Sequence, residues 1–459
     1  MFPEEFQIRI RRQQYIDHEL LIKELCNSSP VSIRINPVKW GTKPEGTEGV
    51  PWCRNGWYLK TRPSFTLDPL FHAGCYYPQE ASSMFLEEAI AQIRNDGDQI
   101  RVLDLCGAPG GKSTHLSALI GGNGFLVSNE VIRSRAAVLS ENLVKWGLSN
   151  FIVTQSDPSA FSRLEGFFDM ILVDAPCSGE GMFRDNIAVK EWSVENTLLC
   201  AERQKRILMD VWPSLKEDGM LIYSTCTFNP GENEENIKWL LSRHQAESVK
   251  LDISEFGGIN EIDYDGIFGY GFYPGKIRGE GLFMAILRKK GDSSVHAARF
   301  ARNCFQGLSR DEASVAMAWT SFSDDNILKV GDEAVALPCS KDELGILSGA
   351  LNVIRPGTAL FKRKRNNFLP SHELAMSVRL RKNQFSSVDL GLKEAISYLR
   401  RDNFKIHCPE KGWNLVTYKD VNLGLVNNIG TRFNNYYPVE WRIRMLVPYN
   451  DKTSILEWE

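Results

Sequence analysis

The sequence has no apolar stretch longer than an ordinary strand, so it contains no candidate for a membrane-spanning helix. Its first residues, Met1 to Glu5, lack the basic start and the apolar core of a signal peptide. The ten cysteines include no Cys-x-x-Cys pair, and the histidines form no cluster. We therefore expect a soluble cytoplasmic protein with reduced cysteines, no membrane partner and no structural zinc site.

Internal repeats and low-complexity tracts are also missing, which excludes solenoid and fibrous architectures. The composition is that of a globular protein, with 43% apolar and 24% charged residues. A chain of 459 residues is long enough for about two to four domains around a large core.

The net charge of -3 hides a strong asymmetry along the chain. Residues 351–459 hold 18 lysines and arginines against 10 acids, whereas residues 1–350 hold 36 against 47. The densest cationic run, Lys362 to Arg365, is flanked by Phe361 and Phe368. A solvated turn would explain this run equally well, but the asymmetry as a whole indicates that the C-terminal part faces a polyanion.

Four regions follow from the pattern of strand-like and helix-like stretches. They are a small α/β cap at 1–75, a larger domain at 76–290, a polar, partly helical connector at 291–350 and a β-rich module at 351–459. The cap is predicted to contain a helix at 15–25 and a strand at 31–35, and the module strands at 415–418, 423–426 and 442–447 with a helix at 392–400.

The larger domain alternates predicted strands with predicted helices. The strands are at 100–105, 124–128, 151–154, 170–173 and 220–223, and the helices include 133–146, closed by Gly147, and 194–212, stopped by Pro213. This alternation predicts right-handed βαβ units and a doubly wound α/β fold with a mostly parallel sheet. Ligands of such a sheet bind outside the carboxyl ends of its strands.

A glycine-rich loop, Cys106 to Lys112, follows the first of these strands and leads into a helix whose free N–H groups suit an anionic ligand. A P-loop would need glycine at the position of Cys106, and Pro109 has no amide hydrogen to donate to a phosphate. Acids follow the second and third strands at Glu130 and Asp157, where an adenosine ribose and an adenine would lie. The pattern favours an S-adenosylmethionine pocket, and a nucleotide hydrolase with Asp174 on its magnesium strand remains the alternative.

Two cysteines, Cys177 and Cys226, each follow a buried strand, and Asp174 ends the first of these strands. Carbon 5 of cytosine is methylated only after a thiolate adds to carbon 6, and the adduct must later be resolved by proton removal and elimination. The reaction needs an activated cysteine, an acid for ring nitrogen 3 and a base. These three residues supply the required groups, whereas amino-group methyltransferases carry Asn/Asp-Pro-Pro-Tyr/Phe at this point.

The segments Leu103 to Lys112, Asp174 to Gly181 and Ser224 to Thr227 resemble the motifs of the Sun family of RNA cytosine-5 methyltransferases. Tyr77 to Met84 and Arg278 to Phe283 are similar to further segments of that family. The resemblance implies a class I S-adenosylmethionine-dependent methyltransferase fold that is Rossmann-like and doubly wound.

The C-terminal segments Leu423 to Leu425 and Asn434 to Pro438 resemble the bacterial 16S ribosomal RNA branch, the RsmF type, which ends in a PUA-like RNA-binding module. This resemblance implies that the protein binds RNA and not DNA, with 16S ribosomal RNA or the small subunit as the expected target. It also implies a monomer. A transfer-RNA methyltransferase with the same chemistry and a non-catalytic RNA-binding factor remain open alternatives, and the target nucleotide is not fixed.

The resemblance also implies roles for individual residues. Cys226 would attack the base, Cys177 would assist product release, and Asp174 would contact the base and the cofactor. The cofactor-binding residues would be Cys106, Gly107, Ala108, Pro109, Gly110, Gly111, Lys112, Glu130, Asp157 and Asp174.

Overall fold

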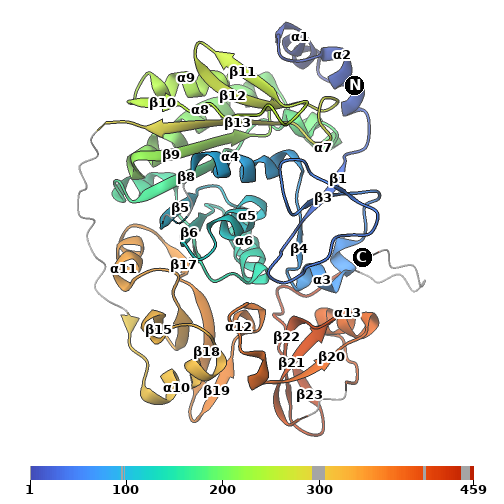
Figure 1. Ribbon diagram of the computed structural model, residues 1–459, viewed down its shortest axis with the longest axis vertical. Helices are drawn as coiled ribbons and strands as arrows, with labels where there is room; N and C mark the ends of the chain where they lie inside the picture. The colour runs from blue at the N-terminus through green and yellow to red at the C-terminus, as the bar shows by residue number, and fades with distance from the viewer. Residues whose placement is uncertain (1, 95–96, 98, 292–304, 407–409, 446–454) are drawn as a thin grey trace.

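The computed structural model describes residues 2–94, 97, 99–291, 305–406, 410–445 and 455–459. Figure 1 shows the N-terminal cap beside a central α/β domain, with two β-rich units below them. No helix among the described residues combines the length and the apolar character that a membrane span requires.

The central domain is built on a twisted sheet in the order β11-β12-β13-β9-β8-β5-β6-β7-β17, and β10 pairs with β13. Its parallel strands are β5 (Ile100–Asp104), β6 (Gly124–Asn129), β7 (Phe151–Thr154), β8 (Phe168–Asp174) and β9 (Leu215–Thr225). Antiparallel strands β10 (Ala246–Ser248), β11 (Asn260–Tyr264), β12 (Ile267–Phe272) and β13 (Leu282–Lys289) extend one side. All five predicted strands are confirmed, because their apolar runs are buried on both faces of the sheet.

Helices connect these strands. They are α4 (Leu86–Ile93), α5 (Gly111–Ile120), α6 (Arg133–Trp146), α7 (Asn186–Glu191), α8 (Val194–Val211) and α9 (Glu234–Leu241). The two predicted helices are confirmed as α6 and α8. Gly147 adopts a left-handed φ of 82° at the end of α6, and the Ser193 side chain caps α8 by accepting from Asn196 N.

The cap contains α1 (Glu4–Arg12), α2 (His18–Leu25) and α3 (Pro69–His72) around a sheet of order β2-β3-β1-β4. Its strands are β1 (Val31–Ile35), β2 (Glu48–Gly49), β3 (Gly56–Leu59) and β4 (Tyr76–Pro78). The predicted helix and strand correspond to α2 and β1. Strand β4 pairs with β1 beyond the predicted boundary at residue 75, so the cap extends further along the chain.

Residues 305–370 form a separate antiparallel sheet of order β14-β15-β16-β18-β19. Its strands are β14 (Phe305–Gln306), β15 (Ile327–Val330), β16 (Glu333–Ala336), β18 (Thr358–Lys364) and β19 (Asn367–Pro370), with helices α10 (Arg310–Trp319) and α11 (Lys341–Ala350). Pairing of β16 with β18 crosses the predicted boundary at residue 350, so the described part of the connector belongs to a folded unit. These strands are short and mix alanine with charged residues. Their sequences therefore lack the alternating apolar pattern that would have predicted strands.

This second sheet is joined to the central domain by β17 (Val353–Arg355), which pairs antiparallel with the edge strand β7. The link covers the exposed edge of the central sheet, where unpaired backbone groups would otherwise invite association. The basic run predicted to face a polyanion lies at the end of β18 and in the turn to β19, where Arg365 has a φ of 56°.

The C-terminal unit contains α12 (His372–Met376), α13 (Leu392–Arg400) and a sheet of order β20-β21-β22-β23. Its strands are β20 (Ser386–Asp389), β21 (Gly412–Tyr418), β22 (Val421–Asn428) and β23 (Phe433–Asn435). The predicted helix at 392–400 and strands at 415–418 and 423–426 are confirmed. The predicted strand at 442–447 is wrong for residues 442–445, which form no strand, while 446 and 447 lie outside the described residues.

One hydrophobic core is shared by the cap and the C-terminal unit. Ile33 and Tyr76 from the cap pack in the same cluster as Tyr398, Leu399 and Tyr437 from the C-terminal unit. The two ends of the chain therefore form one continuous structure beside the central domain.

The cap docks on the central domain through the buried Arg34 on β1. Its guanidinium donates to Gln79 Oε1 at 2.8 Å, Thr114 Oγ1 at 2.7 Å and Gly111 O at 3.3 Å. The same group lies 4.4 Å from the ring centroid of Trp146, and burial lowers the pKa of Arg34 to about 10. A single cation thus joins the cap to helix α5, which begins at the glycine loop.

We expect Arg34→Met to lower the thermal stability of the protein. It removes a buried donor from three acceptors, and each acceptor left unpaired costs about 1–3 kcal/mol. Differential scanning fluorimetry measures the melting midpoint, and Arg62→Met, at an exposed position of the cap, serves as the matched control. Equal midpoints for the two variants would contradict this account of the domain contact.

Candidate active site

The predicted site residues cluster at the carboxyl edge of the central sheet. Strands β8 and β9 are parallel neighbours with Asp174 in register with Ser224, so the segments that follow them leave the sheet side by side. Cys177 lies three residues beyond Asp174 and Cys226 two residues beyond Ser224. The sheet thus places both cysteines at the edge where a ligand of such a fold binds.

The two cysteine side chains are in direct contact. Their Sγ atoms lie 2.8 Å apart, and the Cys226 N–H donates to the Cys177 Sγ at 3.2 Å. The hydrogen bond with Cys226 and burial raise the pKa of the Cys177 thiol well above its ordinary value, and the Glu232 carboxylate adds to the shift. Cys177 is therefore held as a neutral thiol, and from this position it can donate to a thiolate at Cys226.

Two buried glutamates hold the loops that carry the cysteines. Glu232 accepts from Ser178 N at 2.9 Å, from Ser178 Oγ at 2.5 Å and from Gln204 Nε2 at 3.0 Å. Glu180 accepts from the Phe228 N–H at 3.2 Å, and it also forms an ion pair with Arg9 of helix α1. Since Glu180 follows Cys177 and Phe228 follows Cys226, this carboxylate ties the two loops together.

Asp174 connects the cysteine region to the glycine loop. Its Oδ2 atom forms an ion pair with Lys112 Nζ at 2.8 Å, and its Oδ1 atom accepts from Ser224 Oγ at 2.7 Å. Burial acts to lower the pKa of Lys112, but the Asp174 carboxylate outweighs it and raises that pKa above its ordinary value. Lys112 is thus a permanent cation that fixes the Asp174 carboxylate.

The glycine loop, Cys106 to Lys112, turns tightly between β5 and α5. The Gly107 N–H donates to Asn129 O at 2.8 Å, and a Cβ at this position would lie 2.6 Å from Ser128 Oγ. Gly110 adopts a φ of 120°, which L side chains rarely adopt. From helix α6, Arg135 donates to Ala108 O at 2.9 Å and Asn142 to Pro109 O at 2.8 Å, so the loop is fixed from outside.

The predicted cofactor acids Glu130 and Asp157 lie just after β6 and β7, and they differ in environment. Glu130 is buried, accepts from Ile132 N at 2.9 Å and lies 3.5 Å from Arg135 Nη1. Asp157 is exposed and caps the short helix η3 (Pro158–Arg163) through Ser159, whose hydrogen bonds lower the pKa of Asp157. Asp157 therefore makes a helix-capping contact as well as lying just after β7.

Cys106, the first residue of the loop, is not an activated thiol. Burial and the nearby carboxylates of Asp104, Asp174 and Glu130 raise the pKa of Cys106. It therefore stays protonated at neutral pH, which distinguishes it from a nucleophile.

Sequence reasoning missed Asp104, the last residue of β5. It is fully buried, its Oδ2 atom accepts from Ser113 Oγ at 2.6 Å, and its Oδ1 atom has no hydrogen-bond partner among the described residues. Burial raises the pKa of Asp104 to about 7, although the Ser113 hydrogen bond acts against this shift. A buried acid that opens a glycine loop is the signal that could have identified it.

Three family models match successive parts of the chain. The description "16S rRNA methyltransferase RsmB/F" applies to residues 91–288, "N-terminal domain of 16S rRNA methyltransferase RsmF" to 2–81, and "Methyltransferase RsmF PUA domain" to 385–443. The predicted fold class, with a cap before the Rossmann-like domain and a PUA-like module after it, is confirmed. The P-loop alternative is wrong, because its hydrolase class is not that of the matching family.

Similar proteins and structures agree with these matches. A ribosomal RNA small subunit methyltransferase F from Klebsiella pneumoniae (strain 342) is 31% identical, with 96% of each chain covered. Another from Salmonella arizonae is also 31% identical, with 89% of each chain covered. A solved methyltransferase homologue from Pyrococcus horikoshii has a TM-score of 0.53 and 28% identity, covering 63% of this chain and 95% of its own.

The NSun6 structure from Pyrococcus horikoshii has a TM-score of 0.52 over 63% of this chain and 99% of its own, and at 20% identity it supports the fold alone. The full-length relatives at 31% identity support more than the fold, because their similarity extends through the cap and the C-terminal unit as well. The chain therefore belongs to the RsmF family of 16S ribosomal RNA methyltransferases, as the resemblance of its C-terminal segments implied.

Proposed function

We propose that the protein methylates carbon 5 of a cytidine in 16S ribosomal RNA, with S-adenosylmethionine as the methyl donor. Cys226 is the nucleophile, and Cys177 assists release of the product. The observation that carries this proposal is the contact of the two thiols, 2.8 Å apart beside a glycine loop at the carboxyl edge of the sheet. A methyltransferase that acts on an exocyclic amino group would need neither cysteine.

The covalent step explains why two thiols are needed. An electron pair of the Cys226 thiolate forms the bond to carbon 6, and the π electrons of the carbon 5–carbon 6 double bond then form the bond from carbon 5 to the methyl group. A base then removes the proton from carbon 5, the carbon 6–sulfur bond breaks, and the thiolate leaves. Cys177, held neutral next to Cys226, can give a proton to the departing sulfur and so favour release.

Asp174 and Lys112 are placed to orient the base. Ring nitrogen 3 gains electron density when carbon 6 is attacked, so a hydrogen-bonding partner there stabilises the adduct. Asp174 is the group we assign to this contact, because it is fixed by Lys112 and Ser224 in the segment that leads to Cys177. Once ring nitrogen 3 carries a proton, its N–H can donate to the Asp174 carboxylate, which stabilises the adduct.

The residues of the loop fit the proposed cofactor. The start of helix α5 after Gly110 presents free backbone N–H groups for a carboxylate, and the unpartnered Asp104 Oδ1 suits an amino cation. Glu130 and Asp157 are the candidates for the ribose and the adenine. When bound, the cofactor supplies an electrophilic methyl carbon on a sulfonium.

The RNA would bind across several units. From the sequence pattern we assign residues 1–75, 76–290, 291–350 and 351–459 to the cap, the catalytic domain, the connector and the RNA-binding module; strand pairing crosses the limits at 75 and 350. The positive charge of residues 351–459 and the basic turn at Lys362 to Arg365 supply phosphate contacts. We infer a cytoplasmic monomer that extrudes the target cytidine toward Cys226 and does not act on DNA.

Cys226→Ala is expected to abolish methyl transfer, because it removes the only group that adds to carbon 6. Incorporation of labelled methyl groups is measured with 16S ribosomal RNA, small subunits and transfer RNA as separate substrates, and bisulfite sequencing locates the product. Cys339→Ala, which removes a buried thiol far along the chain, is the control. Undiminished transfer by Cys226→Ala would refute the assignment.

Cys177→Ala is expected to trap a covalent protein–RNA adduct, because the departing sulfur loses its proton donor. The adduct survives a denaturing gel and appears as a shifted, labelled band that a ribonuclease trims. If Cys226→Ala traps the adduct and Cys177→Ala does not, the two roles are exchanged.

Cofactor affinity is expected to rise with pH through about 7. Burial raises the pKa of Asp104 to about 7, so at lower pH this carboxyl is neutral and no longer attracts an amino cation. Below about pH 7, the affinity for the cofactor is therefore expected to fall by up to about tenfold per pH unit. Calorimetric titration with S-adenosylmethionine from about pH 6 to about pH 8 tests this sign. Asp104→Asn is expected to flatten the pH profile of cofactor affinity. Asp157→Asn is expected to keep the slope, because the pKa of the native Asp157 carboxyl is lowered, away from this pH range. A steep profile in Asp104→Asn would contradict the assignment.

A further inference from the structure

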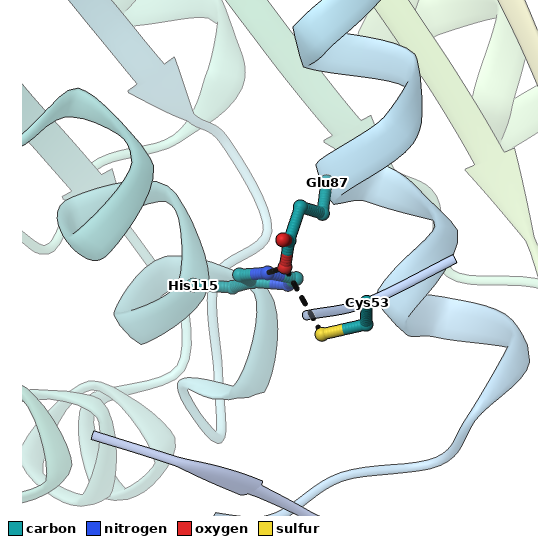
Figure 2. Close-up of side chains that lie close together, drawn as sticks. All are labelled: Cys53, Glu87 and His115. Carbon is teal, nitrogen blue, oxygen red and sulfur yellow. Dashed lines mark hydrogen bonds and ion pairs between the residues drawn. The ribbon is translucent and has the colours of Figure 1, made fainter. Parts of the chain in front are cut away.

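A second cluster of reactive side chains lies away from the active site, between the cap and the central domain. Figure 2 shows Cys53 from the segment before β3, Glu87 from helix α4 and His115 from helix α5 pointing toward one another. One ligand-type atom from each residue lies within 4.8 Å of the other two. The thiol, the carboxylate and the imidazole thus converge on one point.

The three side chains are joined by hydrogen bonds. Glu87 Oε2 accepts from Cys53 Sγ at 3.0 Å and lies 3.1 Å from His115 Nε2, while Glu87 Oε1 accepts from Arg54 N at 3.1 Å. Cys53 is 4% exposed and His115 1% exposed. The glutamate side chain is 22% exposed, so the cluster is closed on the protein side and reached from solvent at Glu87.

One atom in this network has no partner. The Glu87 carboxylate faces Nε2 of His115, and the second nitrogen of the same ring is Nδ1. This Nδ1 atom is buried and has no hydrogen-bond partner among the described residues, which is an unusual state for a polar atom.

We propose that Cys53, Glu87 and His115 bind a divalent zinc ion. A thiolate, an imidazole and a carboxylate are ligands that zinc accepts in a tetrahedral site, and three protein ligands leave a fourth position for water. The soft thiolate favours zinc over magnesium or calcium, which prefer oxygen ligands. Water can enter on the side where Glu87 is exposed.

The charge balance allows the ion to bind close to Arg34. A thiolate and a carboxylate neutralise a divalent cation, so the loaded site carries no net charge. Arg34 is the charged group outside the cluster that acts on both Cys53 and His115, and its guanidinium already donates to Gln79, Thr114 and Gly111. Zinc binds the thiolate form of cysteine, so binding displaces the proton of the Cys53 thiol.

The ion would link three parts of the chain that the sequence keeps apart. Cys53 and Glu87 are separated by 34 residues, and Glu87 and His115 by 28. Such spacings match no zinc motif, which is why the sequence predicted no structural zinc site. Because His115 lies on helix α5, the bound ion would fix the cap against the helix that begins at the glycine loop.

The test measures metal in the full-length chain, without reference to methyl transfer. Protein purified without a polyhistidine tag or chelator and equilibrated with zinc is analysed for metal by mass spectrometry, and cobalt is used as a spectroscopic probe. We expect one zinc per chain and a thiolate-to-cobalt charge-transfer band. Cys53→Ser keeps a hydrogen-bond donor to Glu87 but removes the thiolate, so it separates metal binding from a purely hydrogen-bonded network.

Cys53→Ser is expected to lose the cobalt band and to bind zinc more than about a hundredfold more weakly, since loss of even an outer-shell partner costs about 10–100-fold. His115→Gln should behave in the same way, and Cys339→Ser, at another buried thiol, should bind as the native chain does. Absence of the cobalt band from the native chain, or zinc binding by Cys53→Ser equal to that of the native chain, would overturn the proposal.

Discussion

The parallel pairing of β8 with β9 is the constraint on which the active site depends. Because Asp174 and Ser224 are in register, the loops that follow the two strands leave the sheet side by side. The Sγ atoms of Cys177 and Cys226 in these loops lie 2.8 Å apart. A slip of one residue would turn every side chain of a strand to the opposite face and separate the thiols. The chemistry thus depends on the register of a buried sheet that is held by apolar side chains on both faces.

The loops beyond the strands are held by buried carboxylates. Glu180 connects both cysteine loops with Arg9 of the N-terminal helix, and Glu232 holds Ser178 through its backbone and its hydroxyl. Buried charges are costly unless they are paired, so these contacts fix the loops in one arrangement. The N-terminal helix therefore supports the two loops that carry the cysteines and is also part of the cap.

Helix α5 is the element on which the domains converge. Its first turn follows the glycine loop, Arg34 of the cap donates to Gly111 O and Thr114 Oγ1, and His115 reaches the carboxylate of Glu87. A ligand in the loop and a change at the cap contact would act on the same helix. This arrangement would couple binding of the proposed cofactor to the docking of the cap in one short segment of the chain.

Most of the central domain could be read from the sequence, because apolar runs and turn residues are local signals. The five strands, helices α6 and α8, the glycine loop and the two cysteines were all visible in this way. The sheet at residues 305–370 was not, since its short strands alternate weakly and acquire their core only by pairing across residue 350. The predicted strand at 442–447 failed at residues 442–445 because an alternating pattern does not ensure a pairing partner.

The sequence by itself determined which residues follow which strands, and hence the class of fold and the types of side chain at its ligand edge. Only the tertiary structure decided how close Cys177 lies to Cys226, that burial raises the pKa of Asp104, and that Cys53, Glu87 and His115 meet. The reason is physical: hydrophobic periodicity and turn chemistry act over a few residues, whereas pKa values and ligand geometry depend on burial and on contacts between segments far apart in the chain.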